Sequence, residues 1–462
     1  MPGMPGINIW KIYAVVMDLG RVYVLAAFLY CVMILAGGFL LTVLMMASRL
    51  KHLHSRISGG NSFSLAGIFN MIKNERRYCC ESSLAAMLIL GLLTVSCSSF
   101  KVAHPTRTDD FGSPEYVDIA NHNYYHESPE VPLRQIDHYK LTAAPIKDVF
   151  VIGNAVVMVT KNGRAYGEII SGKKIRGKLK FDNNSEAFAT LYKDRYLLLA
   201  LKLARNSLLC YDLIEGKYKW KTNAGLQGAA PVAADSTVYV ISRFKHASRY
   251  SLATGKRIWK KKTDEFAHTT ACIANDLLVF GTDAGTVKTL YRKDGEPAWE
   301  RQLKGPFYAT PIFDGKTVFV FSVDESITAL HPETGDVIWE KMIKGGVWET
   351  PALKGDQLIV ATSSGKIYSL NTADGAIQWE NTISTPVGTS PVIASDQIFI
   401  GGDDRMFYAM DLNSGDITWQ TELKGRVRTN PRIAGNYVIV GSENKDVYVF
   451  EHEPETESER SQ

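Results

Sequence analysis

The chain has 462 residues, of which 45% are hydrophobic and 22% are charged, and a formal net charge of +4. These shares are ordinary for a soluble domain, and the net charge is too small to indicate nucleic-acid binding. Cys210 and Cys272 lie in different parts of the chain without the spacing of metal ligands. We expect them to be small buried residues, with a disulfide as the alternative.

The first 70 residues contain an uncharged stretch, Val22–Ala47, that is long enough to span a bilayer. Basic residues follow it, as in the cytoplasmic flank of a membrane helix: Arg49, Lys51 and Arg56. Two interpretations are open for residues 1–70. They form a transmembrane helix, or they come from a gene start placed upstream of the true start at Met71. In both cases the remainder of the chain is delivered outside the cytoplasm.

Residues 71–96 have the layout of a secretory signal peptide. Met71 is followed by three basic residues and then by an uncharged apolar run from Leu84 to Val95. Cys97 comes directly after the small Ser96, which resembles the lipobox of bacterial lipoproteins, although Thr94 is an imperfect match to it. This resemblance implies acylation of Cys97. An ordinary cleaved signal and a short membrane anchor are the alternatives.

Residues 97–133 contain Pro105, Pro114 and Pro129 among many polar residues and show no periodicity, so they are expected to be a tether. At the other end of the chain, residues 452–462 are acidic and carry no apolar side chain, which predicts a disordered tail. Between the two lies a repetitive region, residues 134–451.

The repetitive region is marked by tryptophans at spacings of 39, 40, 40, 40 and 40 residues, each four residues after a glycine. The pairs are Gly216 and Trp220, Gly255 and Trp259, Gly295 and Trp299, Gly335 and Trp339, Gly375 and Trp379, and Gly415 and Trp419. Prolines recur with the same period: Pro231, Pro311, Pro351, Pro391 and Pro431. A period of about 40 residues indicates a solenoid, a helical array or propeller blades.

The content of one repeat selects the propeller. Within Thr310–Lys341, the runs Thr317–Ser322 and Ser326–Leu330 read as strands, Asp336–Lys341 as a third, and Thr310–Asp314 as a shorter one at the start. No long stretch between residues 140 and 450 has the apolar spacing of a helix, which excludes helical repeats. Four short strands per repeat predict a β-propeller blade.

Counting the repeats predicts an all-β, eight-bladed propeller. One further repeat precedes Trp220, with Ser171 and Gly172 at its turn, and the last repeat lacks its outer strand. We expect Gln135–Thr142 to supply that strand and close the ring, because closure leaves no open sheet edge.

The glycine and the tryptophan of each repeat have structural explanations. The hairpin before the tryptophan strand needs a residue with positive φ, which glycine adopts without steric cost. A large flat indole ring fills the widening gap between neighbouring blades near their outer edges. We therefore expect both positions to serve the scaffold.

Two further sets of equivalent positions in the repeats, which we call columns, lie just before the prolines. The residues four positions before the last four prolines are apolar and are expected to pack: Phe307, Val347, Val387 and Val427. The residues three positions before the prolines, or before Ala271 where the proline is missing, vary: Gly228, His268, Tyr308, Trp348, Gly388 and Arg428. Tyrosine, tryptophan and arginine dominate binding hot spots. His268, Tyr308, Trp348 and Arg428 are therefore candidate partner-binding residues around the central channel, with local packing as the alternative.

A lipoprotein-type signal ending at Cys97, a tether and eight Gly-x-x-x-Trp repeats resemble the BamB family of the outer-membrane β-barrel assembly machinery. The resemblance implies a non-enzymatic lipoprotein scaffold on the periplasmic face of the outer membrane, without cofactor or small-molecule substrate. It also implies contacts with a BamA-like barrel protein and with nascent outer-membrane proteins. The family's Leu- and Arg-rich rim loop has no counterpart in Lys260–Ala271, so those residues are not carried over.

Two alternatives remain. Quinone-dependent dehydrogenases share the Gly-x-x-x-Trp motif, but they need an Asp base, a Ca²⁺ site and often a vicinal disulfide beside the quinone. Here the vicinal pair Cys79 and Cys80 lies in the signal segment, and the blades carry no insertions that could roof a cofactor. The third class is a periplasmic binding or signalling propeller with another partner.

Overall fold

A computed structural model of the chain describes residues 123–127, 129–170, 177–182 and 186–454. The segments 1–70 and 71–96, Cys97, the turn at Ser171 and Gly172, and residues 455–462 of the tail lie outside the described residues. The regular structure of the described part is β. No helix long and apolar enough to cross a membrane occurs among the described residues.

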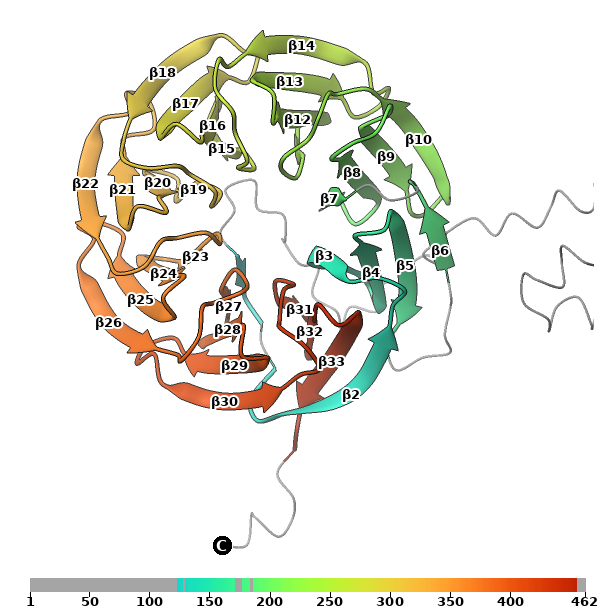
Figure 1. Cartoon of the computed structure of the whole chain (residues 1–462), viewed down its shortest axis with the longest axis vertical. Coiled ribbons are helices and arrows are strands. Elements are labelled where there is room, and N and C mark those ends of the chain that lie inside the picture. Colours follow the sequence, from blue (N-terminus) through green and yellow to red (C-terminus); the bar gives the residue numbers. More distant parts are fainter. Residues whose placement is uncertain (1–122, 128, 171–176, 183–185, 455–462) are drawn as a thin grey trace, which may run out of the picture. The chain divides into compact units, whose positions relative to one another are not determined.

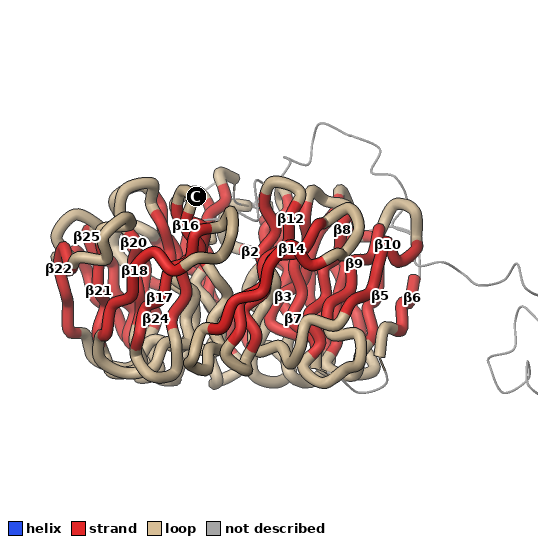
Figure 2. Tube along the Cα trace, turned by 90° about the horizontal axis from the view of Figure 1, so that it is seen from above, coloured by secondary structure: helices blue, strands red, loops and turns tan. Residues whose placement is uncertain are grey.

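Eight sheets form a closed ring around a central axis, which confirms the predicted eight-bladed propeller (Figure 1). Each blade has four antiparallel strands arranged from the axis outward, and blade 7 has one additional inner strand. Seen from the side, the strands run between two faces formed by loops (Figure 2).

Every blade begins with a strand near the axis and ends with one at the rim. From the axis outward, blade 1 consists of β3 (Pro145–Ile152), β4 (Ala155–Thr160), β5 (Arg164–Ile169) and β6 (Gly177–Lys180), and blade 2 of β7 (Ala187–Tyr192), β8 (Tyr196–Leu201), β9 (Leu208–Asp212) and β10 (Lys217–Thr222). Blade 3 consists of β11 (Val232–Ala234), β12 (Thr237–Ser242), β13 (His246–Ser251) and β14 (Arg257–Lys262). Blade 4 consists of β15 (Cys272–Ala274), β16 (Leu277–Gly281), β17 (Thr286–Tyr291) and β18 (Pro297–Gln302). In the same direction, blade 5 consists of β19 (Ile312–Phe313), β20 (Val318–Phe321), β21 (Ser326–Leu330) and β22 (Val337–Met342), and blade 6 of β23 (Ala352–Lys354), β24 (Gln357–Ala361), β25 (Lys366–Asn371) and β26 (Ile377–Thr382). Blade 7 consists of β1 (Tyr124–Tyr125), β27 (Val392–Ala394), β28 (Gln397–Gly401), β29 (Met406–Asp411) and β30 (Ile417–Glu422). Blade 8 consists of β31 (Arg432–Ala434), β32 (Tyr437–Gly441), β33 (Asp446–His452) and β2 (Leu133–Lys140).

The ring is closed by the strand that the sequence predicts. β2 pairs antiparallel with β33, so the outer strand of blade 8 comes from the N-terminal side of the domain. The strand begins two residues before the predicted Gln135. Asp446 of β33 is fully buried and accepts hydrogen bonds from His138 (2.8 Å) and Lys140 (3.0 Å) of β2. Side-chain contacts therefore reinforce the backbone pairing at the closure.

The predicted tether, residues 97–133, needs a correction at its end. Its described residues include β1, which pairs in parallel with β27 at the axis of the ring. Tyr125 is 7% exposed and packs between blades 7 and 8, and the Asn123 amide donates to the carbonyls of Thr350 (3.2 Å) and Pro351 (3.1 Å). Two residues are too few for a strand periodicity, so the sequence carries no signal of this pairing.

The hydrophobic core consists of layers between neighbouring blades, and each layer is built from the facing sides of two sheets. The second and third strands of a blade are covered on both sides, and this explains their continuous apolar runs, such as Val318–Phe321. The outer strands alternate between exposed and partly buried residues, as in β22. Because blade 8 also packs on blade 1, the ring of layers has no end.

Candidate functional site

The repeated tryptophans join neighbouring blades. Five of the six indole N–H groups donate a hydrogen bond to a carbonyl of the next blade, as Trp339 does to Thr372 (2.9 Å). The same bond recurs from Trp220 to Leu252 (2.7 Å), Trp259 to Arg292 (3.1 Å), Trp299 to Pro332 (2.8 Å) and Trp379 to Leu412 (3.0 Å). Trp419 instead packs edge-on against Phe450 of blade 8 at 5.7 Å. These tryptophans lie between blades, where the sequence analysis expects them.

The repeated glycines have positive φ, between 67° and 78°, as predicted for the turn. The structure adds a second reason for glycine, which the sequence pattern does not reveal. A Cβ on Gly255 would approach the indole of Trp220 to 2.5 Å, and Gly295, Gly335, Gly375 and Gly415 stand in the same relation to the preceding tryptophan. Each of these five glycines is thus a turn residue in its own blade and also leaves room for the indole of the blade before it.

The six residues of the variable column meet around one cavity of about 440 Å³ at the centre of the ring. They are Gly228, His268, Tyr308, Trp348, Gly388 and Arg428, and residues of all eight blades contribute to the lining. Each lies on the linker that enters an inner strand. This arrangement places the column on the face where the inner strands begin.

Three members of the column form a continuous aromatic surface. His268 packs edge-on against Tyr308 with ring centroids 5.9 Å apart, and Tyr308 stacks on Trp348 at 4.9 Å with an interplanar angle of 20°. Trp348 is 51% exposed, although it is one of the largest apolar side chains of the chain. An exposed, stacked indole at a concave site is a feature of binding surfaces.

Several polar and charged side chains around the cavity are held in pairs. His268 Nδ1 lies 2.8 Å from Asp283, and Arg428 donates to Asp403 at 2.9 Å. Lys147 of blade 1 donates to both carboxylate oxygens of Glu349 (2.9 and 2.8 Å), on the linker into blade 6. The lining therefore combines an aromatic surface with neutralised ion pairs.

Asp148, beside Lys147, also lines the cavity. Burial raises the pKa of its carboxyl, while the hydrogen bond from Asn430 (2.9 Å) and the charges of Lys147 and Arg432 oppose that rise. The Asn430 backbone N–H donates to the Lys147 carbonyl. This group of contacts joins blade 8 to blade 1 at the cavity.

A second column, directly before the proline, also lines the cavity and was not singled out from the sequence. Ala230 is one member, and the other five are small polar residues, with Ala271 in place of the proline after Thr270: Thr270, Thr310, Thr350, Ser390 and Asn430. These residues also join neighbouring blades. The backbone N–H of Thr310 donates to Thr350 Oγ1 (3.2 Å), and the backbone N–H of Ser390 donates to Asn430 Oδ1 (2.9 Å). The same 40-residue spacing could have revealed this column.

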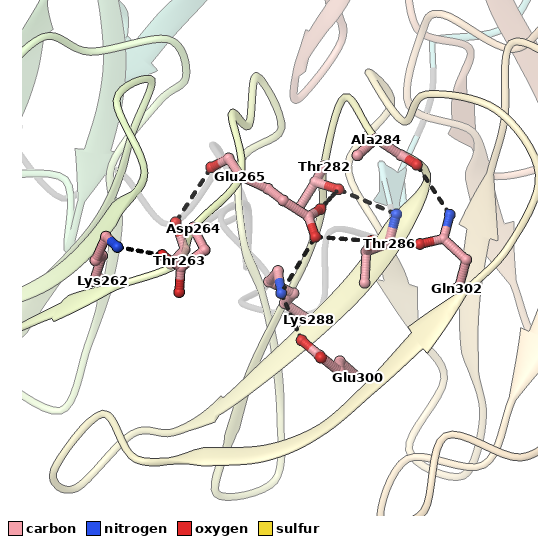
Figure 3. A network of polar contacts seen from close by, with 10 residues as sticks. All are labelled: Lys262, Thr263, Asp264, Glu265, Thr282, Ala284, Thr286, Lys288, Glu300 and Gln302. Carbon is pink, nitrogen blue, oxygen red and sulfur yellow. Dashed lines mark hydrogen bonds and ion pairs between the residues drawn. The ribbon is translucent and has the colours of Figure 1, made fainter.

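The linker Lys260–Ala271, which lacks the family's Leu- and Arg-rich motif, carries a polar network instead (Figure 3). The Glu265 carboxylate accepts hydrogen bonds from Thr282 (2.5 Å) and Thr286 (3.1 Å) and lies 3.5 Å from Lys288. Burial opposes the charge of Lys288, but hydrogen bonds from its ammonium to Glu300 and Glu265 outweigh this effect and raise its pKa. Glu265 thus fastens the linker to β17.

Cys210 and Cys272 are both buried, as expected, and burial raises the pKa of Cys210 to about 12. Three or more His, Cys, Asp or Glu side chains placed to hold a metal ion do not occur together anywhere in the described ranges.

Several solved structures share the fold at low sequence identity. BamB from Moraxella catarrhalis matches with a TM-score of 0.60 and 15% identity, covering 69% of this chain and 100% of that one. A europium-containing methanol dehydrogenase matches with a TM-score of 0.59 and 13% identity, covering 72% and 96%. The quinohemoprotein alcohol dehydrogenase ADHIIG from Pseudomonas putida HK5 matches with a TM-score of 0.57 and 12% identity, covering 70% and 78%. At these identities the likeness shows the fold alone.

A search of curated proteins finds no match to the chain. The sequence model of one family, described as outer membrane protein assembly factor BamB, matches residues 204–290 and 243–453. Together the two matches span residues 204–453, more than half of the 462 residues. The chain therefore belongs to the BamB family of PQQ-repeat propellers.

Proposed function

We propose that the protein is a non-enzymatic scaffold of outer-membrane β-barrel assembly, acting through contacts with a BamA-like barrel protein. The observation that carries this proposal is the family match over residues 204–453. The eight-bladed ring supports it, because a closed propeller presents rigid loops on two faces without an unpaired sheet edge at its closure. Nascent outer-membrane proteins are the second class of partner in this proposal.

The proposed contact surface is the variable column with its cavity. Trp348 and Tyr308 are stacked and surrounded by paired charges, the arrangement that favours a hot spot with little conformational entropy to lose. Membrane attachment through acylated Cys97, on the periplasmic face of the outer membrane, belongs to the same proposal. It rests on the signal-like residues 71–96, which lie outside the described residues.

The proposal is tested by isolating the protein from detergent-extracted membranes and identifying its companions by mass spectrometry. We expect a BamA-like barrel protein to co-purify with the wild-type chain and to be depleted with a Tyr308→Ala and Trp348→Ala double variant at equal protein level. A matched control is Tyr291→Ala, an exposed aromatic residue of β17. Absence of any barrel protein from the wild-type sample would contradict the proposal.

The similarity to methanol and alcohol dehydrogenases makes a quinone enzyme the second candidate. The proposal predicts that the purified chain does not bind pyrroloquinoline quinone in calorimetry, with or without added Ca²⁺. Stoichiometric quinone binding, or dye reduction with alcohols, would favour the enzyme instead. Co-purification of a different periplasmic partner would favour a binding or signalling propeller.

A further inference from the structure

A second cavity, of about 270 Å³, lies next to the central one at the linker into blade 7. Trp348, from the linker into blade 6, and Arg428, from the linker into blade 8, both line it. Pro386 and Val387 of the intervening linker contribute apolar surface. We call this cavity the Trp348–Arg428 slot.

The slot exists because the variable column has no side chain at its blade 7 position. Gly388 stands there, between Trp348 and Arg428 in the order of the blades. A Cβ at Gly388 would come within 2.6 Å of the Val427 carbonyl oxygen, so close packing of the backbone requires a glycine. The same glycine leaves the space between the two large neighbours unfilled.

The walls of the slot are an aromatic ring and a cation. Tyr308 stacks on Trp348 at 4.9 Å, which holds the half-exposed indole in place. Asp403 accepts a hydrogen bond from Arg428 at 2.9 Å and orients the guanidinium, whose side chain is 37% exposed. Indole and guanidinium faces both attract the face of another aromatic ring.

Several polar side chains at the slot are already hydrogen-bonded. Both oxygens of Glu349 accept hydrogen bonds from Lys147, and the Thr362 hydroxyl donates to the Lys366 carbonyl at 3.0 Å. Asp403 Oδ2 accepts the hydrogen bond from Arg428, and the buried Asp403 Oδ1 has no hydrogen-bond partner among the described residues. A sugar would need several free hydrogen-bond partners at its hydroxyls, more than this one acceptor, whereas an aromatic side chain needs only the two faces and the apolar surface.

We propose that the Trp348–Arg428 slot binds an aromatic side chain of an extended polypeptide, inserted between the indole and the guanidinium. The inference rests on the proposed use of the variable column as an interaction surface, and it specifies the chemistry that the surface selects. A saturated ring of the same size lacks the π-face, so the slot prefers an aromatic ring to its saturated analogue by about tenfold.

The test uses the full chain in detergent and a fluorescein-labelled ten-residue peptide of alternating Thr and Phe, with binding followed by anisotropy. A second peptide carries cyclohexylalanine in place of each Phe, which keeps the size and the apolar surface. We expect the Phe peptide to bind about tenfold more tightly. Equal affinity of the two peptides would overturn the proposal, because the preference would then be for apolar surface alone.

Variants of the slot residues test whether the preference for the Phe peptide arises in the slot. Trp348→Leu and Arg428→Met should each reduce the preference for Phe several-fold, while Arg428→Lys, which keeps a cation, should retain most of it. The matched controls Tyr291→Leu and Arg426→Met, an exposed aromatic residue on β17 and an exposed arginine of the same linker, should leave it unchanged. Unchanged preference in both Trp348→Leu and Arg428→Met would place the peptide elsewhere and overturn the proposal.

Two further results complete the test. Displacement of the peptide by a soluble chitooligosaccharide, with no preference for Phe, would assign the slot to carbohydrate and overturn the proposal. Because the peptide assay needs no other cellular component, a tenfold preference for Phe supports the slot even where no barrel protein co-purifies. Loss of that preference with intact co-purification overturns the slot and leaves the scaffold function standing.

Discussion

Gly335 lies directly against the indole of Trp299 in the preceding blade: a Cβ at Gly335 would stand 2.4 Å from Trp299 Cε3. The same glycine has a φ of +72°. One position thus satisfies the turn of its own blade and the packing of the blade before it. A glycine at this position of a repeat therefore permits the close contact with the indole of the preceding blade.

Gly335→Ala should destabilise the domain more than Gly315→Ala. Both residues have positive φ, and alanine there costs about 1–2 kcal/mol. A Cβ at Gly315 meets nothing within 4 Å, whereas at Gly335 it overlaps the Trp299 ring and adds an overpacking cost of about 1–3 kcal/mol. Chemical denaturation of the two variants measures the difference. Equal losses would mean that the indole moves aside freely.

Trp339→Ala and Trp348→Ala should differ in their effects. Trp339 packs against the core layer between blades 5 and 6 and donates to the Thr372 carbonyl, so its removal should cost about 3–5 kcal/mol and lower the melting temperature. Trp348 is 51% exposed, and its removal should change stability little while weakening partner binding by at least about 2 kcal/mol if it is a hot spot.

The comparison between these two tryptophans must be made at matched levels of folded protein, because loss of fold imitates loss of binding. A Trp348→Ala variant that melts as early as Trp339→Ala, or that binds the partner with unchanged affinity, would show that the column serves packing.

Asp212→Asn should destabilise the domain at neutral pH by about 1–3 kcal/mol. Burial disfavours the Asp212 carboxylate, but hydrogen bonds from Arg195 (2.8 Å) and from the backbone amides of Glu215 and Ile214 outweigh it and lower its pKa. A lowered folded-state pKa means that this stabilisation is complete above the unfolded pKa of about 3.9 and is lost as pH falls through the folded pKa.

The stability difference between wild type and Asp212→Asn should therefore shrink as pH falls below about 4, measured by denaturation at several pH values. The exposed Asp264, whose pKa is lowered by its contact with Lys262, provides the control. Asp264→Asn should change stability little at any pH, because solvent screens an exposed pair. A pH-independent effect of Asp212→Asn would assign its role to hydrogen bonding alone.

Cys97→Ser should abolish incorporation of palmitate and release the protein from membranes. One acyl chain binds a bilayer only marginally, whereas the several chains of a bacterial lipoprotein hold it firmly. Metabolic labelling followed by membrane fractionation measures both effects, and Cys210→Ser, a buried free thiol, is the control. Undiminished label in the Cys97→Ser variant would rule out acylation at this residue.

The propeller can be predicted from the amino-acid sequence alone, because the sequence signals are local and repeated. The strand Ser326–Leu330 is predicted with the bounds that the structure shows, and the closing strand differs from its prediction by two residues at each end. Strand periodicity, turn glycines and the 40-residue spacing of tryptophans act within one blade or between adjacent blades, so they can be read along the chain.

The arrangement of side chains at the centre of the ring could not be predicted from the sequence. The spacing places Trp348 and Arg428 in one column, but the slot between them depends on the depth at which each linker enters the ring and on the absence of a side chain at Gly388. Lys147 and Glu349 are 202 residues apart and five repeats separate them, yet their side chains bond at 2.8 Å. No periodic signal encodes such a pair, because it forms only when the closed ring brings non-neighbouring blades to a common axis.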